Sequence, residues 1–195
     1  MSGFQGAIFS RRGVKVVAFR GTAQAMDVVA DLKLGTGMNS TYFGLGQQFA
    51  SLVNGPGVIV TGHSLGGAIA QVVANRTGHV LASFNAPGVG VIVSRNLGES
   101  NASMNIVRAG GMLLSSIRHP IQAVSDVRNT FRSVKGVNLC LKNDAVSKIG
   151  NHYGQVLRIP GTSINPLTEH SIKTVISVLQ QPENAALARR SPSFY

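Results

Sequence analysis

Residues 58–75, VIVTGHSLGGAIAQVVAN, constrain the fold more than any other stretch of the sequence. A β-branched apolar run leads into a turn with three glycines and one serine, and an alanine- and valine-rich pattern typical of a helix follows. The order strand, Gly62-His63-Ser64-Leu65-Gly66, helix matches the G-x-S-x-G nucleophile elbow, in which a strained turn exposes a serine hydroxyl. The pattern also arises by chance in glycine-rich chains, but the strand before it and the helix after it favour the elbow.

The segments around the elbow alternate between predicted strands and predicted helices. Strands are predicted at 14–19, 58–60, within 79–88, at 137–141 and at 155–159, and helices at 23–32, in the second half of 38–53, around 71–76 and at 171–179. Such alternation predicts a mostly parallel central sheet with helices on both faces. We therefore expect a compact α/β-hydrolase-like fold in a single domain, residues 1–195. Within it, residues 95–135 are predicted as a basic, irregular or helical insertion and residues 183–195 as a loosely attached tail.

Composition excludes disordered and membrane-spanning classes of protein. With 44% hydrophobic and 13% charged residues, the chain is too apolar to be disordered, and no apolar run approaches the roughly 20 residues of a spanning helix. The arginines at 11–12 follow the first apolar stretch, which is the wrong order for a secretory signal. We expect a cytoplasmic protein, or one exported by a signal-independent route, that is peripheral to membranes. Cys140 is the single cysteine and is predicted to be inert core.

The charge of the chain favours an anionic partner. Eighteen lysines and arginines against seven acids give a net charge of +11, which suits an acidic lipid surface or nucleic acid. Nucleic acid is the less favoured partner because the aromatic residues do not interleave with lysines. The sequence has no zinc-ligand spacing, P-loop or dinucleotide fingerprint. An anionic membrane surface is therefore the expected partner.

A serine hydroxyl is a weak nucleophile, so it needs a base, and the base needs an acid that fixes its tautomer. The acids after Ser64 are Glu99, Asp126, Asp144, Glu169 and Glu183, and the histidines are His79, His119, His152 and His170. Asp144 follows the predicted strand 137–141, and His170 follows the last predicted strand and a long loop, so both suit the carboxyl edge of the sheet. We predict Ser64, Asp144 and His170 as the triad. His63 is interpreted as a packing residue and His152 as a structural hydrogen-bonding residue.

Negative charge on a carbonyl oxygen needs at least two hydrogen-bond donors. The N–H of Leu65, directly after the serine, is the usual first donor, and the second comes from the loop after an earlier strand. Arg20-Gly21-Thr22 is such a loop, and Thr22 offers both its backbone N–H and its hydroxyl. We predict Thr22 and Leu65 as the oxyanion hole. A plain tight turn after a strand is the alternative for this loop.

The segments VVAFRGT, DVVADL, VTGHSLGGAIAQVVA, FNAPG, NDAVSKIGNHYG and EHSI together resemble the class 3 lipase family, the fungal-lipase-like branch of the α/β-hydrolases. The resemblance extends from residue 14 to residue 172 and is most specific at the elbow and at FRGT. It implies a serine triad, Thr22 in the oxyanion hole, acyl-ester substrates, and no metal or organic cofactor. A compact, strongly basic chain without a signal or a disulfide also resembles antibacterial lipase effectors delivered by secretion machines.

Two features depart from that family. A tryptophan commonly follows the aspartate at the position of Asp27, and this chain has no tryptophan. Members usually carry an N-terminal helical segment before the first strand, whereas the first strand predicted here starts at Val14. We expect the difference to be made up by a protein partner, by dimerisation or by a larger parent protein.

Taken together, these features predict a serine-dependent carboxylester hydrolase that works through an acyl-enzyme. The basic residues of 95–135, interleaved with apolar ones, suggest a lipase of the phospholipase A1 type acting on anionic membranes. The alternative from a different class is a catalytically silent hydrolase-fold binding module whose basic face holds an anionic membrane or nucleic acid.

Overall fold

The computed structural model describes residues 4–21, 40–53, 55–89 and 134–189. The predicted helix at 23–32, the predicted donor Thr22 and nearly all of the predicted insertion 95–135 lie outside these residues. Within the described residues, no helix has the length and apolar character needed to cross a membrane.

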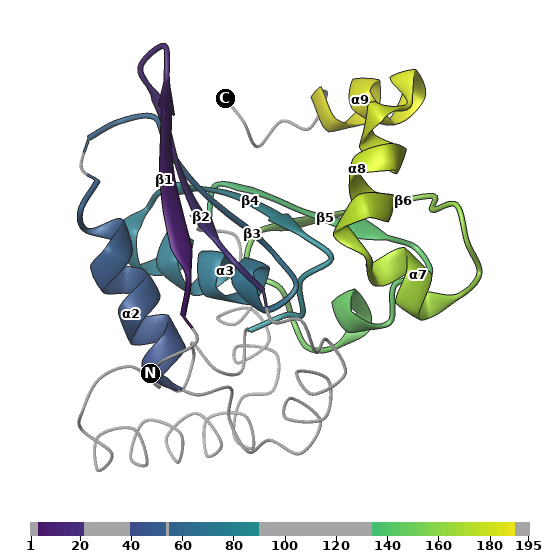
Figure 1. Cartoon of the computed structure of the whole chain (residues 1–195), viewed down its shortest axis with the longest axis horizontal. Helices are drawn as coiled ribbons and strands as arrows, with labels where there is room; N and C mark the ends of the chain where they lie inside the picture. The colour runs from purple at the N-terminus through teal and green to yellow at the C-terminus, as the bar shows by residue number, and fades with distance from the viewer. Residues whose placement is uncertain (1–3, 22–39, 54, 90–133, 190–195) are drawn as a thin grey trace, which may run out of the picture.

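The described strands form one mixed sheet whose order in space follows their order in the chain (Figure 1). They are β1 (Gly6–Arg11), β2 (Val14–Phe19), β3 (Val58–His63), β4 (Val80–Phe84), β5 (Gly136–Leu141) and β6 (Gln155–Ile159). The pairing of β1 with β2 is antiparallel, and every later pair is parallel. The predicted α/β-hydrolase-like fold with a mostly parallel sheet is therefore confirmed.

Strand β1 is not among the strands predicted from the sequence. It pairs with β2 from Gly6 opposite Phe19 to Arg11 opposite Val14, which leaves a two-residue loop. Both loop residues, Arg12 and Gly13, have positive φ angles of 50° and 80°, as the favoured two-residue hairpin turns require. The glycine at the second loop position was the available signal. The sheet therefore starts with an antiparallel edge hairpin.

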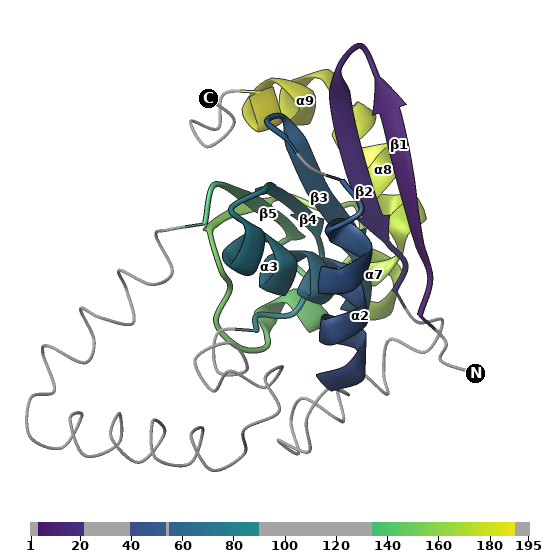
Figure 2. The same cartoon turned by 90° about the vertical axis from the view of Figure 1, so that its left-hand side faces the viewer.

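Helices cover both faces of the sheet, as predicted. The helices are α2 (Ser40–Ala50), α3 (Leu65–Thr77), α7 (Pro166–His170), α8 (Ile172–Gln180) and α9 (Pro182–Arg189), with a short 3₁₀ helix, η1 (Val146–Lys148). Figures 1 and 2 show α2 and α3 on one side of the strands and α8 on the other. Two separate apolar clusters fill these layers. Phe43, Ile69 and Val60 belong to the first, and Ile159 and Val178 belong to the second.

Helix α3 lies close to the sheet because its inner residues are small. All residues from Leu65 to Ala74 are buried, and most of them are glycine, alanine or valine. The helix ends at Gly78, which adopts the left-handed conformation at φ 73° and donates its N–H to Ala74 O, a common helix terminator. This packing fixes the N-terminus of α3 against the ends of the strands.

The first part of the predicted tail, from residue 183 on, lies in helix α9. Asn184 of α9 is buried, and its side-chain amide donates to Val178 O at 3.2 Å. The five-residue helix α7 lies within 160–170, where the sequence predicts a loop. Residues 190–195 of the predicted tail lie outside the described residues.

Candidate active site

Ser64 occupies the turn between β3 and α3, and its backbone is strained. Its φ of 56° and ψ of −126° lie in a region that non-glycine residues rarely adopt, at a strain energy on the order of 1–3 kcal/mol. Two backbone hydrogen bonds hold the turn. Ser64 N–H donates to Phe84 O at 3.1 Å, and Ala68 N–H donates to Ser64 O at 3.1 Å. The predicted elbow is therefore present in the structure.

The glycines of the motif are required by backbone contacts. A Cβ on Gly62 would lie 2.2 Å from the carbonyl carbon of Gly66, and one on Gly66 would lie 2.1 Å from Phe19 O. Neither neighbour can move away, because both are backbone atoms. Gly21 approaches the elbow in the same way, since its Cβ would lie 2.6 Å from His63 O. The chain after β2 therefore passes directly beside the serine turn.

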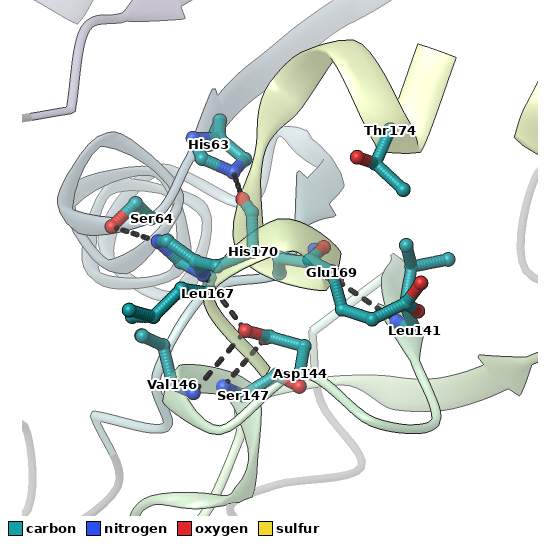
Figure 3. A network of polar contacts seen from close by, with 12 residues as sticks. His63, Ser64, Leu141, Asp144, Val146, Ser147, Leu167, Glu169, His170 and Thr174 are labelled. Carbon is teal, nitrogen blue, oxygen red and sulfur yellow. Dashed lines mark hydrogen bonds and ion pairs between the residues drawn. The ribbon is translucent and has the colours of Figure 1, made fainter. Parts of the chain in front are cut away.

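His170 lies between Ser64 and Asp144 (Figure 3). Its Nε2 is 2.9 Å from Ser64 Oγ, and its Nδ1 is 2.8 Å from Asp144 Oδ1. An ionised carboxylate only accepts hydrogen bonds, so Asp144 favours the tautomer with the proton on Nδ1. Nε2 is then the acceptor for the serine hydroxyl. All three side chains are buried, with His170 5% exposed and the other two fully enclosed.

Asp144 is held by the backbone that follows it. Its Oδ1 accepts from Val146 N–H at 3.2 Å, and its Oδ2 accepts from Ser147 N–H at 2.8 Å at the start of η1. Burial raises the pKa of Asp144, but its hydrogen bonds with His170 and Ser147 and the charge of His170 outweigh that effect and lower the pKa below its usual value. The acid therefore stays ionised beside the imidazole.

His170 lies where the short helix α7 ends and α8 is about to begin. Asn165 caps α7 by accepting hydrogen bonds from Leu167 N–H and Thr168 N–H, and Pro166 occupies the first helical position, which favours proline. Ser171 then caps α8 by accepting from Lys173 N–H at 3.3 Å. His170 is therefore the last residue of α7, directly before the cap of α8.

His63 holds the backbone of His170 rather than acting on the serine. Its Nε2–H donates to His170 O at 2.6 Å, and the two rings lie with centroids 4.8 Å apart. Burial, together with the neighbouring His170, lowers the pKa of His63 to about 4. His63 is therefore neutral at neutral pH. The packing role expected for His63 therefore includes a hydrogen bond that the sequence does not indicate.

Glu169, beside the base in sequence, is a buried carboxylate with a structural function. Its Oε1 accepts from Thr162 N–H at 2.8 Å and from Ser163 N–H at 2.6 Å, so it folds the loop before α7 back on itself. Gly161 leaves room for this carboxylate, because a Cβ at that position would overlap it unless the Glu169 side chain shifted. No local sequence pattern indicated these hydrogen bonds of Glu169.

His152 and Cys140 have structural rather than catalytic surroundings. His152 Nε2 lies 2.8 Å from Ala86 O, in agreement with its expected structural hydrogen bond. Cys140 is buried, and burial raises the pKa of its thiol to about 11, which opposes a nucleophilic function. Among the described residues, no group of three or more His, Cys, Asp or Glu side chains could hold a metal ion.

Of the two predicted oxyanion donors, Leu65 and Thr22, only Leu65 lies within the described residues. Leu65 is the first residue of α3, and the first N–H groups of a helix have no partner within the helix. Its N–H therefore belongs to the amide-rich end of α3, directly after the serine. Thr22 lies outside the described residues, although its neighbour Gly21 contacts the elbow.

Comparisons with known proteins identify the family of the chain. Residues 1–164 match the phospholipase-like family described as the Tle-like phospholipase domain. An extracellular phospholipase A1 of Serratia liquefaciens is 28% identical over 187 residues, which cover 92% of this chain and 57% of that protein. The chain thus spans little more than half the length of this relative.

Two solved structures are distantly similar to this chain. An α/β hydrolase enzyme from the metagenome of lagoon sediments at Mar Chica, Morocco, has a TM-score of 0.43 and 18% identity, over 95% of this chain and 97% of the other. The RedJ thioesterase of the prodiginine pathway in Streptomyces coelicolor has a TM-score of 0.31 and 14% identity, over 77% and 66%. The family match supports the predicted lipase and phospholipase class, and the assignment to class 3 in particular stays a prediction. The chain belongs to the Tle-like phospholipase domain family.

Proposed function

We propose that this protein is a serine-dependent carboxylester hydrolase that removes an acyl chain from phospholipids, as a phospholipase A1. The observation that carries the proposal is the continuous hydrogen-bonded chain from Ser64 Oγ through His170 to Asp144. These two hydrogen bonds convert a weakly nucleophilic hydroxyl into one that is able to attack an ester.

The reaction follows from the positions of the protons in the Ser64–His170–Asp144 hydrogen bonds. As Ser64 Oγ forms a bond to the ester carbonyl carbon, its proton moves to His170 Nε2, and Asp144 stabilises the resulting imidazolium. The tetrahedral intermediate expels the lysophospholipid alcohol, which takes the proton from Nε2 and leaves an acyl-serine. Water then repeats the sequence, with His170 as base, and releases the fatty acid and free Ser64.

The developing oxyanion is proposed to bind the N–H groups of Leu65 and Thr22. Support comes from the position of Leu65 at the start of α3, where the helix end favours negative charge. The approach of Gly21 to His63 O provides support for Thr22. Ser64 is fully enclosed, so the atoms that cover Oγ have to move before an ester can reach it.

The phospholipid part of the proposal is supported by the family match and by the Serratia phospholipase A1. The anionic surface is supported by the net charge of +11, since each Lys or Arg near an acidic bilayer contributes about 1 kcal/mol of attraction. A protein partner or an oligomer is also proposed.

Phosphatidylglycerol vesicles with a labelled sn-1 or sn-2 chain test the proposal. The wild type should release labelled fatty acid mainly from the sn-1 position, and Ser64→Ala should lose the activity by several orders of magnitude. Ser51→Ala, at an exposed serine outside the site, is the matched control and should retain full activity. Vesicle binding without release of fatty acid would instead support the binding module.

A further inference from the structure

Asn85 is a buried amide with an unusual backbone. It follows the last residue of β4, its side chain is 0% exposed, and its φ is 44°. Asparagine is one of the few residues other than glycine that adopt this left-handed conformation. A polar side chain enclosed in this way needs hydrogen-bond partners at both its amide nitrogen and its oxygen.

The partners of the Asn85 side chain lie on the two segments that carry the acid and the base. Its Oδ1 accepts from Leu141 N–H at 2.8 Å, at the last residue of β5 and three residues before Asp144. Its Nδ2 donates to Glu169 O at 2.7 Å, the carbonyl directly before His170. A single side chain thus bridges the backbone segments of Asp144 and His170.

The backbone around Asn85 reaches the third segment. Phe84 O accepts the N–H of Ser64 at 3.1 Å, and Asn85 N–H donates to Leu139 O at 2.9 Å. The dipeptide at the end of β4 therefore contacts the serine turn, the aspartate strand and the histidine helix. We infer that Asn85 is a positioning residue that sets the His170 ring between Ser64 and Asp144, an inference that rests on the proposed function.

The reason lies in the shortness of α7. The last carbonyls of a helix have no partner within it, and in this five-residue helix they belong to the residues around His170 itself. Asn85 satisfies the carbonyl of Glu169, and His63 satisfies that of His170. Without the amide of Asn85, a buried carbonyl loses its donor, and the peptide group before His170 is free to rotate.

Rotation of that peptide moves the imidazole relative to two fixed partners. Ser64 is anchored by the elbow, and Asp144 is anchored by the backbone of η1. A displacement of about 1 Å at a reacting group lowers turnover by about 10²-fold. Loss of the Asn85 amide should therefore reduce kcat and leave KM nearly unchanged.

Two variants separate positioning from backbone effects. Asn85→Gly removes both side-chain hydrogen bonds and suits the positive φ, whereas Asn85→Asp keeps the oxygen for Leu141 N–H and removes the donor to Glu169 O. The matched control is Asn138→Ala. Asn138 is equally buried and lies on β5 as Leu141 does, but its side-chain amide donates to Tyr153 O, ahead of β6, and not to the backbone beside Asp144 or His170.

The readouts are kcat and KM for vesicle hydrolysis, the rate of Ser64 labelling by a fluorophosphonate, and the low-field proton resonance of the His170–Asp144 hydrogen bond. Asn85→Gly and Asn85→Asp should each lower kcat and labelling by about 10²-fold with KM nearly unchanged, and should weaken or abolish the resonance. Asn138→Ala, even if it melts earlier, should keep the resonance and most of kcat.

Retention of kcat, labelling and the resonance within about twofold in both Asn85 variants, well below the 10²-fold expected from misplacement, would overturn the inference. Equal losses in folded Asn138→Ala would overturn it as well, because they would mark a general structural effect. If the wild type neither hydrolyses vesicles nor reacts with the probe, the proposed function fails, and the resonance still decides whether Asn85 positions His170.

Discussion

At the scale of single residues, the tautomer of His170 decides the reactivity of the site. Asp144 accepts from His170 Nδ1 and also from two backbone N–H groups. Every one of these contacts requires an acceptor oxygen. These donors therefore stabilise the ionised form of the Asp144 carboxylate.

Asp144→Asn should lower kcat on the order of 10⁴-fold, because the amide can leave the proton of the imidazole on the nitrogen that faces Ser64. The measurement is steady-state hydrolysis of vesicles and of a soluble ester. KM should change little, since Asp144 does not face the substrate. An activity within tenfold of the wild type, far above this expectation, would remove Asp144 from the triad.

His63 should make stability depend on pH. Its pKa is about 4 in the folded protein, against a usual value of 6.5, so the unfolded chain binds the proton first as pH falls. The free energy of unfolding should therefore drop by on the order of 2–3 kcal/mol between about pH 6.5 and pH 4 because of this residue. In His63→Gln, which keeps a donor for His170 O, urea titrations should show a shallower drop. Equal slopes in both proteins would contradict the assignment.

Single residues were predictable where local sequence carries the chemistry. Ser64 follows from its motif, and Asp144 and His170 follow from their positions after strands. Asn85, by contrast, acts through partners 56 and 84 residues away, and nothing near it in the sequence announces them. Only the folded sheet brings these groups together.

At the scale of elements, the elbow depends on close contact between strand and helix. Gly66→Ala would place a methyl group against Phe19 O, so either the turn opens or β2 shifts. We expect loss of Ser64 reactivity and a lower midpoint of urea unfolding. Gly44→Ala in α2 is the control, because its Cβ meets nothing within 4 Å and alanine should stabilise the helix by about 0.5–1 kcal/mol. Similar urea midpoints for the two variants would contradict the role of the contact.

Elements were predictable where their periodicity was strong. β2 and β6 have the predicted bounds, because short β-branched runs flanked by turns mark strands. β1 was not predicted because all of its residues are exposed. Without a buried face, the strand shows no alternation of apolar and polar residues. α7 was not predicted because a single helical turn shows no period, and the cap at Asn165 with Pro166 after it was the available signal.

At the scale of the whole molecule, charge should govern access to the bilayer. With a net charge of +11, hydrolysis of phosphatidylglycerol vesicles should fall steeply as salt rises from about 0.05 M to 0.5 M, where screening is strong. Hydrolysis of a short soluble ester should change much less. Equal salt dependence of the two substrates would contradict electrostatic recruitment. The cellular location and the delivery route remain predictions from the sequence.

The central claim is that His170 and Asp144 activate the hydroxyl of Ser64. Mass spectrometry of the protein after reaction with a fluorophosphonate tests it most directly. The account predicts a phosphonyl adduct on the peptide that contains Ser64 in the wild type, and no comparable adduct in folded His170→Ala. An adduct on another residue, or equal modification of Ser64 in both proteins, would contradict it.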